Sequence, residues 1–193
     1  MEDVVLETDR LLLRPWIPDD APALYPLAAS PVVGPACGWA PHANVAETRM
    51  VIRNVLMGPE SYAIVSKDTY DIIGAVSLKF HRGAFTRDDS EPEVGFWLGE
   101  PYWGHRFAEE AVAAVIERAF TVLDCVAVWA CYFDDNERAH KVLERLHFIY
   151  EQTEPWVTTT TGKHARHEMC LTRDRWPMLS GERGGRPFAM ARY

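Results

Sequence analysis

Residues 92–112 read PEVGFWLGEPYWGHRFAEEAV, and this stretch decides the fold. Its first apolar run, at 93–98, predicts a strand that a Gly-Glu-Pro turn ends. From about 104 to 123, apolar residues recur on one helical face, which predicts the longest helix of the chain. The nearly unbroken apolar run at 125–132 is typical of a strand covered on both faces. A strand–helix–strand unit of this kind needs a right-handed crossover, which makes its two strands parallel.

The residues before this unit predict a strand and two helices. Residues 9–16 form an apolar strand, and the Asp-Asp pair that follows can cap a short helix. Residues 30–43 are rich in proline and glycine, which predicts a long loop. Asn44, with Glu47 three residues later, is typical of a capping box at the start of a helix. We expect the apolar side chains of that second helix to point inward, namely Val45, Val51, Ile52, Val55 and Leu56.

The rest of the chain predicts further strands and one more helix. Residues 61–67 and 71–80 flank a turn and indicate a β-hairpin. Residues 136–146 form an amphipathic helix, and strands are expected at 147–153 and 165–172. This order indicates an α/β (α+β) fold, in which helices cover both faces of a mixed sheet. Ligands of such sheets bind outside the carboxyl ends of the parallel strands.

Length and composition are those of one globular domain. The 193 residues include 28 acidic and 20 basic side chains, for a formal charge of −8, and 48% of the residues are hydrophobic. We predict a single domain over 1–176 and a tail over 177–193. No apolar run approaches the ~18 residues of a membrane span, and the first residues lack the pattern of a leader. We therefore expect a soluble, cytoplasmic protein without a membrane partner.

Charge and potential metal ligands restrict the partners further. Nucleic-acid binders normally carry a basic patch, so the acid excess predicts no nucleic-acid partner and mildly favours a cationic or neutral ligand. The most basic stretches are short, at 138–145 and 183–192. The four cysteines lack zinc-ligand spacing and are expected to be reduced and buried. His164 and His167, which precede Glu168, point to opposite faces of one strand, so we predict no metal site.

The turn between the 93–98 strand and the long helix is a predicted anion site. The first N–H groups of a helix have no partner within the helix, and the helix dipole adds about half a positive charge there. His105 and Arg106 can add charged donors to these amides. The alternative is an ordinary loop whose amides are bound by water.

Three segments, in this order and at these separations, resemble the GCN5-related N-acetyltransferases (GNAT), and most closely their RimJ/RimL branch. They are LETDRLLLRPW at 6–16, PEVGFWLGEPYWGHRFAEEAV at 92–112 and DDNERAHKVLERLHF at 134–148. The resemblance covers about residues 6–173. It implies a GNAT fold with a mixed, mostly antiparallel central sheet, in which the parallel strands 93–98 and 125–132 splay apart.

The resemblance also implies that acetyl-CoA is the co-substrate. Its pantetheine arm would lie between the splayed strands and bind their main chain, and its pyrophosphate would lie on the amides at the helix start. Asn136 commonly contacts the cofactor in this family, and the alternative for this residue is a simple N-cap. The cofactor-binding residues implied in this way are Phe96, Trp97, Leu98, Trp103, Gly104, His105, Arg106, Phe107, Ala108 and Asn136.

Three positions depart from the family pattern. Arg106 stands where the phosphate loop usually has a glycine, which removes room for the backbone and adds a cation. Ala139 stands where many relatives carry a serine that can protonate the departing thiolate. His147 replaces the glycine that usually follows the helix, often with a positive φ. We expect cofactor binding to survive and the role of the serine to be left to water or to a nearby tyrosine.

Transfer to an amine needs a base, because an ammonium of pKa ~10.4 holds almost no free amine at neutral pH. Glu93 matches a position used as base in this branch, whereas Glu91 is a poorer candidate in the preceding loop. The alternative for Glu93 is a salt bridge at the edge of the sheet. A backbone N–H of residues 96–98 would stabilise the tetrahedral oxyanion.

Acceptor recognition is assigned to aromatic residues. Trp39 and His42 lie in the loop between the first two predicted helices, which borders the acceptor cleft in this fold. Tyr150, with Trp156 and the 81–90 loop, is expected on the other side of the cleft. The alternative for each aromatic side chain is packing alone.

The sequence therefore predicts an acetyl-CoA-dependent N-acetyltransferase that works by direct transfer in a ternary complex. The acceptor is a primary amine, either a protein N-terminus or a small amine. The alternative, motivated by Arg106 and Ala139, is a non-catalytic acyl-CoA-binding module. Many relatives pair as dimers, so a homodimer is among the expected assemblies.

Overall fold

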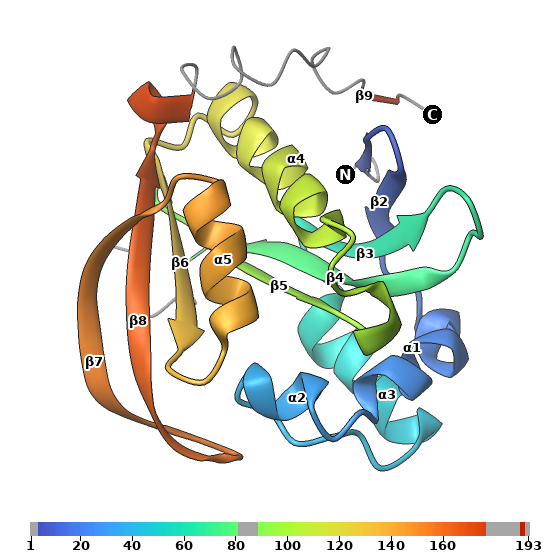
Figure 1. Cartoon of the computed structure of the whole chain (residues 1–193). Coiled ribbons are helices and arrows are strands. Elements are labelled where there is room, and N and C mark those ends of the chain that lie inside the picture. The colour runs from blue at the N-terminus through green and yellow to red at the C-terminus, as the bar shows by residue number, and fades with distance from the viewer. Residues whose placement is uncertain (1–3, 81–88, 177–189, 192–193) are drawn as a thin grey trace.

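The computed structural model describes residues 4–80, 89–176 and 190–191. Nine strands form one sheet in the order β7-β8-β6-β5-β4-β3-β2-β1-β9. The pair β5–β6 is parallel and the other neighbours are antiparallel. Helices α4 and α5 lie on one face of the sheet, and α1 and α3 lie on the other (Figure 1). The predicted α/β (α+β) fold, with a mixed and mostly antiparallel sheet, is confirmed.

The elements have the following bounds. The strands are β1 (Val5–Glu7), β2 (Leu11–Pro15), β3 (Ser61–Ser66), β4 (Ile72–Lys79), β5 (Glu93–Leu98), β6 (Ala127–Phe133), β7 (Ile149–Thr159), β8 (Gly162–Thr172) and β9 (Met190–Ala191). The helices are α1 (Ala21–Ala28), α2 (Val33–Ala36), α3 (Val45–Val51), α4 (Phe107–Thr121) and α5 (Glu137–Arg145). Short 3₁₀ segments lie at Pro18–Asp20, Glu100–Tyr102 and Arg173–Arg175.

Two apolar cores lie on the two faces of the sheet. The larger core is built on the predicted stripe of α4, which packs on the central strands through Ala111, Val112, Val115, Ala119 and Phe120. The smaller core lies under α1 and the residue that follows α3, where Leu24 and Ile52 are fully buried against β3 and β4. Burial on both faces holds the middle of the sheet in place, and the candidate site is built on its strand β5.

The second predicted helix is divided. Asn44 caps α3 as predicted, because the Glu47 N–H donates to Asn44 Oδ1 at 2.9 Å, but the Glu47 carboxylate accepts from the N–H of Ala43, the residue before the cap, at 2.5 Å, so the reciprocal bond of a capping box is shifted by one residue. After α3 the chain continues as one π-helical segment, Ile52–Leu56. The wider π turn changes which side chains face the core. Val55 is consequently 67% exposed, and the prediction that it points inward is wrong.

Other differences are short elements or longer strands. The predicted 30–43 loop contains the single helical turn α2, and the first strand is preceded by β1. The hairpin β7–β8 extends into the polar run at its tip, where Thr159 pairs with Gly162. Two residues of the predicted tail form β9, which pairs with β1. Residues 177–189 and 192–193 of that tail lie outside the described residues.

All four cysteines, which are described, are free thiols, as expected. Cys125 and Cys170 are buried, whereas Cys37 and Cys131 are partly exposed. Within the described ranges, no helix has the length and apolar character needed to cross a membrane.

A buried ion pair fastens α4 to the sheet. Arg118 donates from Nε and Nη2 to the two carboxylate oxygens of Glu60, both at 2.7 Å. The Tyr62 hydroxyl also donates to Glu60, at 2.6 Å, and burial together with this bond raises the pKa of Tyr62. The side chains of Arg118 and Glu60 are only 9% and 11% exposed. Loss of one partner would therefore leave the other as a buried, unpaired charge.

Arg118→Met should lower the free energy of unfolding by about 3–5 kcal/mol, because the Glu60 carboxylate loses its counter-charge. Urea unfolding followed by circular dichroism measures this loss. The double variant Arg118→Met, Glu60→Gln should lose less, since a neutral amide still accepts from Tyr62 and needs no cation. Equal stability of the single and the double variant would contradict this account.

Candidate active site

The parallel strands β5 and β6 are paired over only two residues. Glu93 lies opposite Trp129 and Val94 opposite Ala130. On its other edge, β5 stays paired with β4 as far as Leu98. Beyond Val94, the edge of β5 that faces β6 is therefore not paired with it, which is the predicted splay (Figure 1).

Phe96 and Leu98 direct their main-chain groups into this gap. Main-chain groups alternate between the two edges of a strand, and the Gly99 N–H donates to Ile73 O of β4 at 3.0 Å. By this alternation, the main chain of Trp97 also faces β4, and those of Phe96 and Leu98 face away from it. The prediction that the Trp97 main chain meets the cofactor is corrected accordingly, because the sheet uses it.

A cavity of about 310 Å³ continues from the gap toward the start of α4. It lies between the end of β5, the loop before α4, and α5. Of the predicted cofactor-binding residues, it is lined by Phe96, Trp97, Leu98, Trp103, Gly104, Arg106, Phe107, Ala108 and Asn136, while His105 is absent from the lining. Ala139 also lines the cavity. The remaining lining residues were not assigned to the cofactor from the sequence; they are Val33, Ala36, Cys37, Tyr102, Glu109, Arg138, Lys141, Val142 and Arg145.

The anion loop, defined here as residues 104–108, leads into α4. The helix begins at Phe107, so Gly104, His105 and Arg106 precede the helix that was predicted to start at 104. Gly104 and Arg106 have φ values of +81° and +62°. Arg106 therefore adopts the left-handed backbone that the usual glycine supplies freely and that costs other residues about 1–2 kcal/mol. Arg106 thus holds, at some cost, a backbone conformation that glycine adopts freely.

Arginines neutralise the acidic first turn of α4. Glu109 pairs with Arg145 of α5 at 2.6 Å and lies 3.8 Å from Arg106. Glu110 pairs with Arg10 at 2.6 Å. The carboxylates of this turn therefore do not cancel the positive end of the helix dipole, and the start of α4 suits an anion.

Helix α5 supplies further cations to the cavity. The Arg138 guanidinium stacks over the Trp103 ring at 4.1 Å, and the Trp103 indole N–H donates to Leu98 O at 2.9 Å. Lys141 and Arg145 line the same wall. These three basic residues stand at spacings of three and four on one helix face, a signal that could have assigned the basic 138–145 stretch to the site.

Asn136 joins α5 to α2 at one end of the cavity. Its Oδ1 accepts from the Ala139 N–H at 3.2 Å, and its Nδ2 donates to Ala36 O at 2.8 Å. The N-cap interpretation is thus confirmed. Ala139 lines the cavity without a side-chain donor, and His147 has the positive φ, +62°, of the glycine it replaces.

Glu93 belongs to a buried polar cluster on the other face of β5 from the Phe96 side chain. Its side chain is 8% exposed, and its Oε1 lies 3.8 Å from Lys79 Nζ. The Cys131 thiol donates to the same oxygen at 3.8 Å. Burial, and then the charge of Glu93, raise the pKa of Cys131 to about 12, so this thiol is protonated at neutral pH. The predicted salt bridge of Glu93 is therefore present.

Glu168 is a second buried carboxylate, directly opposite Cys131 in the register of β6 and β8. It is 1% exposed, and its Oε2 accepts from Gln152 at 2.7 Å. Its Oε1 has no hydrogen-bond partner among the residues described. Burial raises the pKa of Glu168, against the bond from Gln152 and the charge of Arg166. Sequence reasoning considered Glu168 only beside two histidines and missed its burial.

Trp39 and His42 lie together beside Trp97. The Trp39 ring centroid is 5.3 Å from that of His42 and 5.5 Å from that of Trp97. His42 Nδ1 lies 3.0 Å from Thr48 Oγ1, and burial lowers the pKa of this histidine, which keeps its ring neutral at neutral pH. Because Trp97 shares a face of β5 with Glu93, the aromatic pair lies on the predicted acceptor side.

Tyr150 is not brought to that side. The register pairs Tyr150 with Met169 and Met169 with Ala130, whereas the next residue of β6, Cys131, points to the opposite face. Tyr150 is 53% exposed, and the nearby Trp156 is 74% exposed. Residues 81–88 of the other predicted wall lie outside the described residues.

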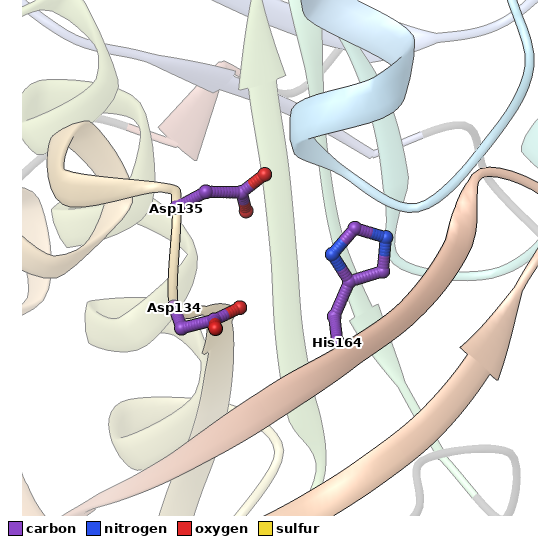
Figure 2. Close-up of side chains that lie close together, drawn as sticks. All are labelled: Asp134, Asp135 and His164. Atoms are coloured by element: carbon purple, nitrogen blue, oxygen red, sulfur yellow. The ribbon is translucent and has the colours of Figure 1, made fainter.

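Asp134, Asp135 and His164 come together where β6 ends (Figure 2). Their ligand atoms all lie within 4.8 Å of one another, and both aspartates are exposed. His164 Nε2 is bound to Thr161 Oγ1 at 3.1 Å, and in Figure 2 its ring stands opposite the two carboxylates. Two carboxylates and an imidazole are a donor set that suits a divalent cation. His167, the predicted neighbour of His164, stacks on Tyr132 instead.

The chain is similar to proteins of a known family. Residues 10–149 match the sequence model of a family described as an acetyltransferase (GNAT) domain. The chain is 29% identical over 151 residues to the "uncharacterized N-acetyltransferase p20" of Bacillus licheniformis, which covers 76% of this chain and 83% of that protein.

Solved structures share the fold. A GNAT-family acetyltransferase from Bacillus anthracis matches with a TM-score of 0.78 at 15% identity, over 88% of this chain and 99% of that one. RimL, a ribosomal L7/L12 alpha-N-protein acetyltransferase solved in complex with coenzyme A, matches with a TM-score of 0.72 at 18% identity. That match covers 88% of this chain and 98% of the RimL chain.

Glu168→Gln should change how stability depends on pH. Because the folded pKa of Glu168 is raised above its usual value of 4.5, the folded state holds the proton more tightly than the unfolded state does. Its contribution is therefore lost as the pH rises through the raised pKa. The amide still accepts from Gln152 but cannot ionise, so the variant should gain stability relative to wild type between about pH 5 and pH 8. Chemical denaturation at both pH values measures the gain.

Glu151→Gln is the matched control, because Glu151 is exposed on β7, the strand that carries Gln152. It should follow the wild type at both pH values. A Glu168→Gln variant whose stability runs parallel to that of wild type across this range would show that Glu168 does not carry the effect.

Proposed function

Because the chain belongs to the GNAT acetyltransferase family, we propose that it transfers the acetyl group of acetyl-CoA to a primary amine. The observation that carries this proposal is the splayed β5–β6 pair, which opens onto a cavity with a cationic far end. Acetyl-CoA combines a narrow, amide-bearing arm with phosphates at one end. The arm fits the gap between β5 and β6, and the phosphates fit the anion loop beyond it.

The residues that would hold acetyl-CoA follow from that fit. The pantetheine amides would pair with the main chain of Phe96 and Leu98, as an added strand pairs with a free sheet edge. The pyrophosphate would bind the amides of the anion loop, with Arg138, Lys141 and Arg145 of α5 as nearby cations. The stacked Trp103 and Arg138 would form one wall.

Glu93 would act as the base. The Glu93 carboxylate takes one proton from the ammonium, which frees the amine. The amine nitrogen then forms a bond to the thioester carbonyl carbon, the carbon–sulfur bond breaks, and the nitrogen loses its second proton to water. A main-chain N–H of Phe96 or Leu98 would bind the oxyanion between the forming of the first bond and the breaking of the second. The CoA thiolate would take a proton from water, since Ala139 offers none. Products are the acetylated amine and CoA.

The acceptor would enter on the face of β5 that carries Glu93 and Trp97, next to Trp39 and His42. The buried carboxylate Glu93 favours an amine that arrives as a cation. A protein N-terminus, the acceptor named for RimL, and a small amine both meet this requirement. A homodimer and a cytoplasmic location stay predictions.

Release of free thiol from acetyl-CoA, measured with a panel of peptides bearing free N-termini and of small polyamines, tests the proposal. Calorimetry with acetyl-CoA is run on the same protein. Acetyl-CoA binding with thiol release for one acceptor class is the expected result. Binding without turnover of any acceptor would favour the non-catalytic acyl-CoA-binding module, and a protein that does not bind acetyl-CoA would refute both.

Glu93→Gln should lower kcat by about 100-fold or more, because the amide cannot take the proton of the attacking amine. The affinity for acetyl-CoA should stay within about twofold, since the cofactor would bind through main-chain groups and cations elsewhere. Steady-state kinetics and calorimetry measure the two quantities.

Glu91→Gln is the control for this variant. Glu91 accepts from the Trp129 indole N–H at 2.9 Å, a bond that an amide oxygen can also accept. Its kcat should match that of wild type. If both variants turn over at the wild-type rate, Glu93 is not the base.

A further inference from the structure

We propose that Arg10, in the turn between β1 and β2, is a positioning residue that sets the anion loop for the cofactor phosphates. The inference rests on the proposed function. Arg10 is absent from the lining of the cavity and lies 95 positions before the loop residue that it binds. It would act through the loop rather than by touching the ligand.

Arg10 contacts the loop in two ways. Its Nη1 donates to the main-chain oxygen of His105 at 3.0 Å. Its guanidinium also lies over the Phe107 ring, with the central carbon 4.5 Å from the ring centroid. These two residues flank Arg106, whose left-handed backbone is the costly point of the loop. Arg10 therefore contacts the loop on both sides of Arg106, the residue with the strained backbone.

The guanidinium is itself held in place by Glu110 in the first turn of α4. Arg10 Nε donates to Glu110 Oε2 at 2.7 Å, and the Arg10 main-chain N–H donates to Oε1 at 2.9 Å. The Thr8 hydroxyl donates to the same Oε1 at 2.5 Å. The carboxylate is only 16% exposed and neutralises the arginine. Arg10 consequently acts by geometry more than by its charge.

The geometry of the His105–Arg106 peptide connects the Arg10 contacts to the side of the loop that would face the cofactor. The peptide between His105 and Arg106 is trans, so its C=O and N–H point in opposite directions. With the His105 carbonyl directed at Arg10, the Arg106 N–H points away from Arg10. Arg106 lines the cavity and Arg10 does not, and the proposal requires that the amide opposite Arg10 faces the cavity. Arg10 thereby orients one of the N–H groups that would bind the pyrophosphate.

Arg10→Lys and Arg10→Gln test the inference with two acetyl donors. Lysine keeps the charge but lacks the planar fork that reaches both Glu110 and the His105 carbonyl. Glutamine lacks both the fork and the charge. Both variants should raise KM for acetyl-CoA by about 10-fold, the value of one lost charged hydrogen bond. KM for acetyl-pantetheine, which lacks the phosphates, should stay within about twofold, as should kcat at saturating acetyl-CoA.

Arg14→Lys is the matched control, because Arg14 also forks onto a carboxylate, that of Asp20, at 2.7 and 2.8 Å. Its KM ratio between the two donors should equal that of wild type, and melting temperatures show whether any variant is merely unstable. Equal changes for both donors, or none, in the Arg10 variants would overturn the inference. If the wild-type protein does not bind acetyl-CoA at all, the proposed function fails instead, which is a separate result.

Discussion

The short pairing of β5 with β6 is the constraint on which the site depends. After Val94 the two strands separate, while β5 remains bound to β4 along its other edge. That second edge is packed closely, since a Cβ on Gly74 would lie 2.2 Å from the Trp97 carbonyl oxygen. β5 is thus fixed from the β4 side while the main chain of Phe96 and Leu98 faces the gap. An extended, amide-bearing ligand is the natural partner for such an edge.

Charge compensation explains how an acidic chain keeps the start of α4 electropositive. The formal charge of −8 is spread over the whole chain, and two of the acids, Glu109 and Glu110, lie in the first turn of α4. Arg145 from α5 and Arg10 from the β1–β2 turn pair with them. The positive end of the helix is therefore preserved. In the proposed complex, the acidic net charge would then favour a cationic acceptor without opposing the cofactor phosphates.

Short sequence patterns predicted much of the structure. The pairing of distant strands determined most of the positions that these patterns missed. The α4 stripe and the N-cap Asn136 follow from short spacings, which act within one helix. By contrast, Glu168 is buried through its pairing with Cys131, thirty-seven residues earlier, and the register also sets Tyr150 on the far face. Val55 was misplaced because a π turn changes the helical period that the prediction assumed. Strand register and helix irregularity depend on tertiary contacts that a single sequence does not display.

The alternation of residues along β5 separates the proposed base from the proposed main-chain donors. Successive side chains of β5 point to opposite faces, so Glu93 and Trp97 stand on the acceptor side, while the main chain of Phe96 lies in the plane of the sheet and faces the gap. In the proposed mechanism, a base above the plane and N–H donors within it would act on the same thioester carbonyl. The donors are main-chain groups, which any residue supplies. Substitutions such as that of the usual glycine by Arg106 are tolerable so long as the backbone conformation is kept, here at φ +62°. The proposed donors therefore depend on the geometry of β5 more than on its side chains, and the fold itself is shared with a structure only 18% identical.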